Sequence, residues 1–312
     1  MIEPAARAID CDEAVSLIES LTDLVLKAGS AILAVNRSTM KVEGKLDGSS
    51  VTEADLAADC IIGEGLKQLV PHVPELSEER VGEAKPPYRG SFFLVDPLDG
   101  TKEFLAGRNE FTVNLALITN GVPLLGIIGA PALRLLWRGV VGRGAERLRL
   151  DDERRGAPEP IRTRPFPKPG EPWVAAVSRS HSDAKTEAFV DARPGAVRLK
   201  LGSAVKFGRL AEGAADIYPR LAPTSEWDVA AGRSGSVGDM RALSCRYSLP
   251  GAIRRRRPPT TERASPPTPA SASSPGPENA RDRRQRHRDG TRARTDRAGF
   301  PRPGRNGDCR RR

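Results

Sequence analysis

The chain has 312 residues, with 50 Lys and Arg against 40 Asp and Glu, and hence a formal net charge of +10 at pH 7. Its four cysteines show no C-x-x-C spacing, which argues against a zinc site or a disulfide scaffold and favours a reducing cytoplasm. The first residues carry no basic segment followed by an apolar core, and no run of about 18 apolar residues occurs. Neither a secretion signal nor a membrane span is therefore expected.

Two helices are the first predicted elements. Over residues 12–35, apolar residues recur at intervals of three and four, which predicts an amphipathic helix that packs on a sheet. A second helix is predicted over 52–70, where Thr52 and Asp55 have the spacing of a capping box and Pro71 ends the pattern.

Three strands are predicted next, at 92–95, 111–119 and 124–130. The last two are rich in β-branched and aliphatic residues, and Asn120-Gly121-Val122-Pro123 joins them, which predicts a β-hairpin. Gly142-Arg143-Gly144 lacks the third glycine of a dinucleotide-binding loop and is predicted to be a turn.

A polar, proline-rich segment at 151–172 is interpreted as the connection between two halves of the chain. The second half alternates predicted strands and helices: a strand at 173–178, a helix near 182–191, a strand near 197–201, a helix near 203–212 and a strand near 215–219. The expected domains are an N-terminal α/β half that binds metal and phosphate at 1–150, an incomplete substrate-binding half at 151–245, and a basic tail at 246–312.

The basic charge belongs to the C-terminal end. Residues 233–312 carry 21 Arg, no Lys and 7 Asp or Glu, a net of +14, so residues 1–232 have a net charge of −4. This end is rich in Pro, Ser, Ala and Gly, and such a composition buries too little apolar surface to offset the entropy of ordering. We expect disorder after about residue 245.

Three origins of the tail stay open. The complete replacement of Lys by Arg favours an out-of-frame translation of a GC-rich gene, that is, a frameshift. A disordered tail that binds nucleic acid or another anionic surface without specificity is the second, although interleaved aromatic residues for base stacking are missing. An inert natural extension is the third.

The most informative segment is VDPLDGTKEF at 95–104, which follows a predicted strand. Mg²⁺ is usually held by a few carboxylates together with substrate phosphate oxygens, so Asp96 and Asp99, separated by a turn, are candidate ligands. Gly100 lets the backbone approach a ligand, and a helix beginning at Thr101 would offer free N–H groups to an anion. A plain surface turn is the alternative for this segment taken alone.

This segment resembles the signature of the lithium-sensitive, Mg²⁺-dependent phosphomonoesterases of the inositol monophosphatase superfamily. Its ending, Thr101-Lys102-Glu103-Phe104, is similar to that of the 3′(2′),5′-bisphosphate nucleotidases of the CysQ type. Other segments match in the same order: Val51-Thr52-Glu53-Ala54-Asp55, Leu76-Ser77-Glu78-Glu79, Ser178-Arg179-Ser180-His181, Gly202-Ser203-Ala204-Val205-Lys206-Phe207, Tyr218-Pro219-Arg220 and Trp227-Asp228-Val229-Ala230-Ala231-Gly232. The resemblance covers about residues 11–232 and implies a layered α/β/α/β/α sandwich.

The resemblance also implies two or three Mg²⁺ ions and a set of ligands. The ligands would be Glu78, Asp96, the Leu98 carbonyl, Asp99 and Asp228, with Asp96 bridging two ions. Thr101, hydrogen-bonded to Asp55, would orient and deprotonate the attacking water, and Glu79 would act close to the ligands. The alternatives are ordinary: an exposed Glu78–Glu79 loop and helix caps at Asp55 and Asp228.

Substrate contacts follow from the same resemblance. The implied residues are Gly100, Thr101, His181, Ser203, Lys206, Arg220 and Asp228. His181 would lie against the nucleoside, and Ser203 and Lys206 would bind the phosphate that is not cleaved, with Arg220 as a further anion contact. His181 as a surface residue and Lys206 on a solvated helix face remain the alternatives.

The implied reaction is hydrolysis of adenosine 3′,5′-bisphosphate to AMP and phosphate, with adenylyl-sulfate 3′-phosphate as a related substrate. It would clear a by-product of sulfate assimilation in the cytoplasm. One alternative is an inositol or sugar phosphatase, against which Lys102-Glu103 argues. The other is an inactive fold remnant with an Arg-rich, nucleic-acid-binding tail. No membrane partner is expected, and the oligomeric state stays open.

The chain departs from the family pattern after Gly232. Residues 233–238 are RSGSVG, small residues and glycines at the place where the family continues with a helix. We therefore expect the second half to lack its closing elements, Asp228 to be poorly positioned, and the protein to be weakly active or unstable.

Overall fold

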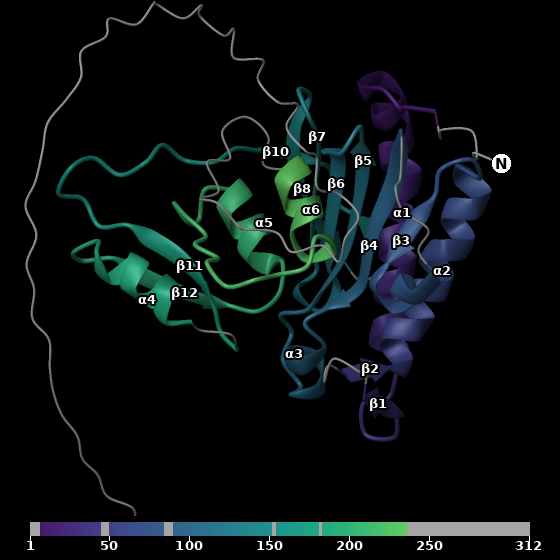
Figure 1. The fold of residues 1–312 in the computed structure, drawn as a ribbon, viewed down its shortest axis with the longest axis horizontal. Coiled ribbons are helices and arrows are strands. Elements are labelled where there is room, and N and C mark those ends of the chain that lie inside the picture. The colour runs from purple at the N-terminus through teal and green to yellow at the C-terminus, as the bar shows by residue number, and fades with distance from the viewer. Residues whose placement is uncertain (1–6, 45–49, 84–89, 152–153, 181–182, 236–312) are drawn as a thin grey trace, which may run out of the picture. The chain divides into compact units, whose positions relative to one another are not determined.

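A mixed β-sheet organises the fold of the described residues (Figure 1). The computed structural model describes residues 7–44, 50–83, 90–151, 154–180 and 183–235. Within these residues the sheet has eight strands: β3 Glu75–Ser77, β4 Ser91–Asp99, β5 Thr112–Thr119, β6 Val122–Ala130, β7 Leu135–Val140, β8 Gly144–Asp151, β9 Arg154–Arg155 and β10 Glu159–Ile161. Their order is β10-β8-β7-β6-β5-β4-β3, with β9 beside β8, and only β3 and β4 are parallel neighbours.

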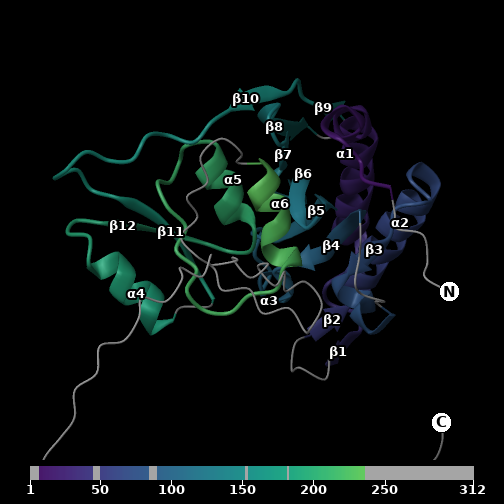
Figure 2. The ribbon, with the colours of Figure 1, turned by 45° about the horizontal axis from the view of Figure 1, so that its top comes forward.

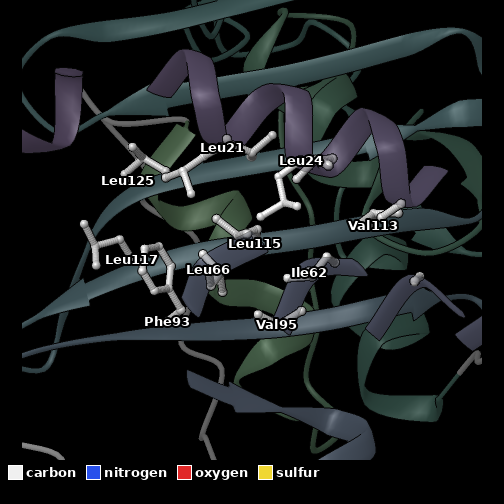
Figure 3. Close-up of a cluster of buried hydrophobic side chains, with 14 of the residues drawn as sticks. Leu21, Leu24, Ile62, Leu66, Phe93, Val95, Val113, Leu115, Leu117 and Leu125 are labelled. Atoms are coloured by element: carbon white, nitrogen blue, oxygen red, sulfur yellow. The ribbon is translucent and has the colours of Figure 1, made fainter. Parts of the chain in front are cut away.

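The central strands are buried on both faces, so their alternate residues enter two different cores. Phe93 of β4 and Leu115 of β5 belong to one hydrophobic cluster, whereas their neighbours Phe92 and Ala116 belong to another. This alternation follows from the two-residue period of a strand. Figure 3 shows the first cluster, where Leu21, Leu24, Ile62 and Leu66 of two helices face the sheet.

Two long helices, α1 Cys11–Ala34 and α2 Glu53–Leu69, cover this first face. Asp10 begins α1 with a capping box, in which its carboxylate accepts from the N–H groups of Asp12 and Glu13. The predicted capping box of Thr52 and Asp55 begins α2. Both helices are confirmed to within one or two residues of the predicted bounds.

The second face is covered by α5 Val205–Ala211 and α6 Trp227–Gly235. Beyond α5 lies a parallel pair of strands, β11 Val174–Ser178 and β12 Val197–Leu201, and helix α4 Ala184–Asp191 packs on its far side through Val190. Figures 1 and 2 show the resulting succession of layers from α1 and α2 to α4. The predicted α/β/α/β/α arrangement is confirmed.

Shorter elements complete the fold. They are the antiparallel strands β1 Val42–Gly44 and β2 Ser50–Thr52, the helix α3 Thr101–Leu105, and the 3₁₀ helices η1 Glu78–Glu83 and η2 Pro131–Leu133. None of the helices within the described residues is long and apolar enough to span a membrane.

Several predicted elements need correction. The strand at 92–95 extends to Asp99, since a bulge lets the chain continue past Pro97. The strand near 215–219 is wrong: Ile217 forms only a single parallel bridge with Ala175. The connection at 151–172 supplies β9 and β10. The hairpin of β5 and β6 and the turn at 142–144 are confirmed, and the predicted tail at 246–312 lies outside the described residues.

The packing of β5 against α1 and α2 gives the first prediction. Leu115 is fully buried in the core that these helices share with the sheet. Leu115→Ala removes apolar contacts and leaves a cavity, so we expect the free energy of unfolding to fall by about 2–5 kcal/mol. Leu56→Ala, on the exposed side of α2 (52% exposed), is the control and should change it little. Equal losses in urea unfolding of the two variants would contradict this.

Candidate metal centre

Three carboxylates from distant parts of the chain meet beside the end of β4. Glu78 of η1, Asp96 of β4 and Asp228 in the first turn of α6 each offer one oxygen, and these three oxygens lie within 4.8 Å of one another. Carboxylate oxygens are the ligands that hard divalent cations prefer. The group can therefore hold a divalent metal ion.

Asp96 tests whether the site fits a cation. Its side chain is buried, and its Oδ1 atom has no hydrogen-bond partner within the described residues. Burial, followed by repulsion from Glu78, Asp99 and Asp228, raises the pKa of Asp96 well above its usual range. A buried carboxylate without a partner is costly. A cation would supply both the missing contact and the missing charge, so the residues fit a metal ion.

Asp99 lies close by but outside this group of three, as far as the described residues go. Its carboxylate accepts from Asn114 Nδ2 (3.3 Å) and Thr112 Oγ1 (3.5 Å). Burial, with a contribution from the negative charge of Asp228, raises the pKa of Asp99 to about 7, although the charge of Lys206 opposes the shift. The β-bulge between Asp96 and Asp99 turns this second carboxylate toward β5.

Thr112 and Asn114 contact a candidate metal ligand, Asp99, and the sequence analysis missed them. In the register of β4 and β5, Asn114 is opposite Asp96 and Thr112 is opposite Asp99. A signal was present: two polar residues two apart at the start of a largely apolar strand lie on the same face. Their side chains therefore line the site from the sheet.

Thr101 and Asp55 are brought together as predicted. Thr101 Oγ1 donates to Asp55 Oδ1 (3.2 Å) and lies 3.3 Å from the Leu98 carbonyl oxygen. The other carboxylate oxygen, Asp55 Oδ2, accepts from the N–H and the hydroxyl of Thr52 (2.7 and 2.6 Å). Burial raises the pKa of Asp55 against these hydrogen bonds, and the cap and the site contact coexist on one carboxylate.

Gly100 makes the turn into α3 possible. Its φ of +94° is in the left-handed region, which glycine adopts without strain. A Cβ atom here would lie 3.1 Å from Ser203 Cβ and 3.3 Å from the Glu110 carbonyl oxygen. Glycine therefore allows the segment with Ser203 to approach the metal-binding turn.

Asp228 is not displaced, contrary to the expectation from the altered sequence after Gly232. Its Oδ2 atom accepts from Thr224 Oγ1 (2.6 Å) and the Ser225 N–H (3.2 Å) at the start of α6. Val229, Ala230 and Ala231 are buried in the second core, so packing against the sheet stabilises the helix where propensity alone is weak. The helix continues to Gly235, and the rest of the expected departure lies outside the described residues.

Two of the predicted substrate residues, Ser203 and Lys206, lie just before and within α5. Ser203 Oγ is 3.2 Å from Thr112 Oγ1, which connects it to Asp99. Lys206 is buried, donates to the Ser203 and Leu201 carbonyls, and its pKa is lowered to about 8 by burial despite attraction from Asp99. Arg220 lies 3.5 Å from the Pro223 carbonyl oxygen.

Glu79 and His181 are the remaining predicted site residues. The backbone N–H of Glu79 donates to Ser77 Oγ (3.4 Å), next to Glu78 in the same turn. His181 lies outside the described residues. The preceding Arg179 forms two hydrogen bonds with Glu110 (2.9 and 2.8 Å), which also accepts from the Gly202 N–H (2.9 Å). These contacts fasten the segment before His181 and the turn before Ser203 to the start of β5.

The part of the chain that forms this site is similar to known proteins. The inositol monophosphatase family matches residues 14–234. The 3′(2′),5′-bisphosphate nucleotidase CysQ of Escherichia coli K12 is 38% identical over 221 residues, covering 70% of this chain and 86% of that protein. The protein of that name from Buchnera aphidicola is 35% identical over 246 residues, covering 76% and 89%.

A solved structure agrees with these sequences. The crystal structure of CysQ from Bacteroides thetaiotaomicron, a bacterial member of the inositol monophosphatase family, has a TM-score of 0.56 and 34% identity, covering 70% of this chain and 84% of that one. Fold, sequence and the clustered carboxylates thus agree, and the chain belongs to the inositol monophosphatase family.

Proposed function

We propose that this chain is a Mg²⁺-dependent phosphomonoesterase that hydrolyses adenosine 3′,5′-bisphosphate to AMP and phosphate. The observation that carries the proposal is the buried Asp96, which meets Glu78 and Asp228 in a family whose matching relatives include bisphosphate nucleotidases. Adenylyl-sulfate 3′-phosphate is a related substrate in this proposal, and sulfate assimilation in the cytoplasm is its setting.

The proposed ligands form two overlapping sets. Glu78, Asp96 and the Leu98 carbonyl would hold one ion, and Asp96, Asp99 and Asp228 a second. Burial and mutual repulsion raise the pKa values of Asp96 and Asp99, and a cation held between these carboxylates would offset both effects. When bound, the ions would neutralise the phosphoryl oxygens and lower the pKa of an attacking water.

Thr101 and Asp55 are the proposed proton acceptors. Because Thr101 Oγ1 donates its own proton to Asp55, the lone pairs of the hydroxyl are free to accept a hydrogen bond from a water molecule. As the hydroxyl proton of Thr101 moves to Asp55 Oδ1, Thr101 Oγ1 can take a proton from that water, so Thr101 stays a neutral hydroxyl and Asp55 gains the proton. The raised pKa of Asp55 favours this role, since a more basic carboxylate accepts a proton more readily. Glu79 would act close to the ligands.

In this proposal the phosphate that is not cleaved distinguishes a nucleotide bisphosphate from other phosphate esters. Ser203, Lys206 and Arg220 would bind it, and Gly100 and Thr101 would face the phosphate that is cleaved. Lys206 supports this assignment because its ammonium group is buried among carbonyl oxygens beside Asp99 rather than solvated. We keep the division into a metal-binding half at 1–150 and a substrate half at 151–245 as part of the proposal, with His181 against the nucleoside.

The direct test is phosphate release from adenosine 3′,5′-bisphosphate with Mg²⁺ present or chelated. We expect release that requires Mg²⁺ and that exceeds release from inositol 1-phosphate by at least about tenfold, because a site that provides partners for a second phosphate rejects a substrate lacking it. Asp96→Asn should abolish release. Faster turnover of inositol 1-phosphate would favour the sugar-phosphatase alternative, and no release from a folded protein would contradict the proposal.

A pH prediction follows from the crowded carboxylates of the metal-free protein. Asp99 has a pKa of about 7 in the folded chain against 3.8 ordinarily, so the folded state binds more protons between these values. The contribution of Asp99 to the free energy of unfolding therefore falls as the pH rises from about 4 to about 7. Asp99→Asn should flatten this fall.

Mg²⁺ should counteract this loss of stability, which is followed by measuring the unfolding temperature against pH. We expect it to raise the unfolding temperature more at pH 7.5 than at pH 5.5, because protons compete for the ligands at the lower pH. A metal effect that is equal at both pH values, or a metal-free profile that rises across this window, would contradict the assignment of these residues.

The Thr101–Asp55 pair gives a kinetic prediction. Thr101→Val keeps the shape of the side chain but removes the hydroxyl, so kcat should fall by about 10²–10⁴-fold, while the Mg²⁺ concentration for half-maximal rate changes little. Thr101→Ser restores the hydroxyl and is the matched control. Loss of cation affinity in Thr101→Val, with kcat preserved, would show that Thr101 serves the metal and not the water.

A further inference from the structure

A cluster of ion pairs lies directly beside the turn that carries Glu78. Arg80 donates from Nε to Asp59 Oδ2 (2.7 Å) and from Nη2 to Asp59 Oδ1 (3.1 Å), and the same Nη2 atom pairs with Glu75. Asp59 also accepts from Ser77 Oγ (2.5 Å). We call these four residues the Arg80 cluster. Because Asp59 is 7% exposed and bound at two points, the pair fixes geometry more firmly than a surface ion pair does.

The Arg80 cluster fastens both ends of the metal-binding turn. Glu78 and Glu79 lie between Ser77 and Arg80, and both of these flanking residues bind the same carboxylate, that of Asp59. The backbone leaves helical geometry at Arg80, with φ −124° and ψ 25°. The position of Glu78 is therefore tied to α2 through one side chain.

Helix α2 leaves room for this arrangement. Asp55, Asp59 and Gly63 are spaced by four residues and lie on one face. Asp55 contacts Thr101, whereas Asp59 receives the guanidinium. A Cβ atom at Gly63 would lie only 2.9 Å from Arg80 Nη2. One face of α2 thus serves the proposed catalytic pair and the metal-binding turn.

The carboxylates of the site repel one another, and the Arg80 cluster holds Glu78 in place against this repulsion. Glu78 approaches Asp96 and Asp228 to within 4.8 Å between carboxylate oxygens, and Asp96 is buried, so water screens the repulsion between these acids only weakly. Without a cation this repulsion drives the turn away from β4. The hydrogen bonds from Ser77 and Arg80 to Asp59 oppose that movement.

We propose that Asp59 and Arg80 are positioning residues that hold the Glu78–Glu79 turn against Asp96, so that the ligands are already arranged when the cation binds. The proposal rests on the metal-dependent function described above. Removing a group that orients a metal ligand typically weakens metal affinity by about 10–100-fold. The loss is expected in cation binding and not in the chemical step.

The experiment measures Mn²⁺ binding by calorimetry on the full chain without substrate. Arg80→Gln and Asp59→Asn should each weaken binding by about tenfold or more. In phosphate release, the Mg²⁺ concentration for half-maximal rate should rise in proportion, while kcat and KM at saturating Mg²⁺ stay within about twofold. Arg80→Lys keeps the charge but not the two-point contact, and should be intermediate.

Arg164→Gln is the matched control. It removes another two-point pair, from Arg164 to Asp216 (2.5 and 2.7 Å), so it should lower the unfolding temperature without changing Mn²⁺ affinity. Gly63→Ala displaces the guanidinium but keeps every charge, and it decides the question if Arg80→Gln does not fold. Wild-type Mn²⁺ affinity in both Arg80→Lys and Gly63→Ala would overturn the proposal. Because binding is measured without turnover, an absence of nucleotidase activity would count only against the proposed function.

Discussion

The repulsion among carboxylates gathered at the end of β4 is the constraint on which the rest of the site depends. Asp96 is buried beside Glu78, Asp99 and Asp228, and burial together with this crowding raises its pKa. Such an arrangement is costly in the absence of a cation, so each acid must be held by the surrounding fold. The stability of the scaffold is thereby linked to the ability to bind metal.

The fold holds each acid by different means. Neutral donors on β5 bind Asp99, the residues before α6 bind Asp228, and Ser77 and Arg80 fasten the turn of Glu78 to α2. These supports come from a sheet and helices that are packed in two hydrophobic cores, and close packing resists displacement. In the proposed reaction, this rigidity lets the cations and the Thr101–Asp55 pair meet the phosphate in a fixed geometry.

Much of the fold could be predicted from short-range sequence patterns. The elements that were missed or wrongly predicted have physical causes. Strands β7 and β8 were missed because charged residues interrupt their apolar pattern; Arg138 is buried there because it pairs with Glu19 and Glu146 and donates to Thr22. Helix α6 was underestimated because propensity ignores the packing of Val229 and its neighbours on the sheet. The strand near 215–219 failed because one bridge to β11 does not continue.

The sequence by itself determined what depends on neighbours along the chain: the capping box of Thr52, the alternation of β4 and β5, and the presence of Asp96 and Asp99 in one short segment. Recognising the family also required only local motifs. The tertiary structure decided which acids meet, because Glu78 and Asp228 reach Asp96 through packing of η1 and α6 on the sheet. It alone revealed the Arg80 cluster, since a bond between α2 and a distant turn leaves no periodic signal in sequence.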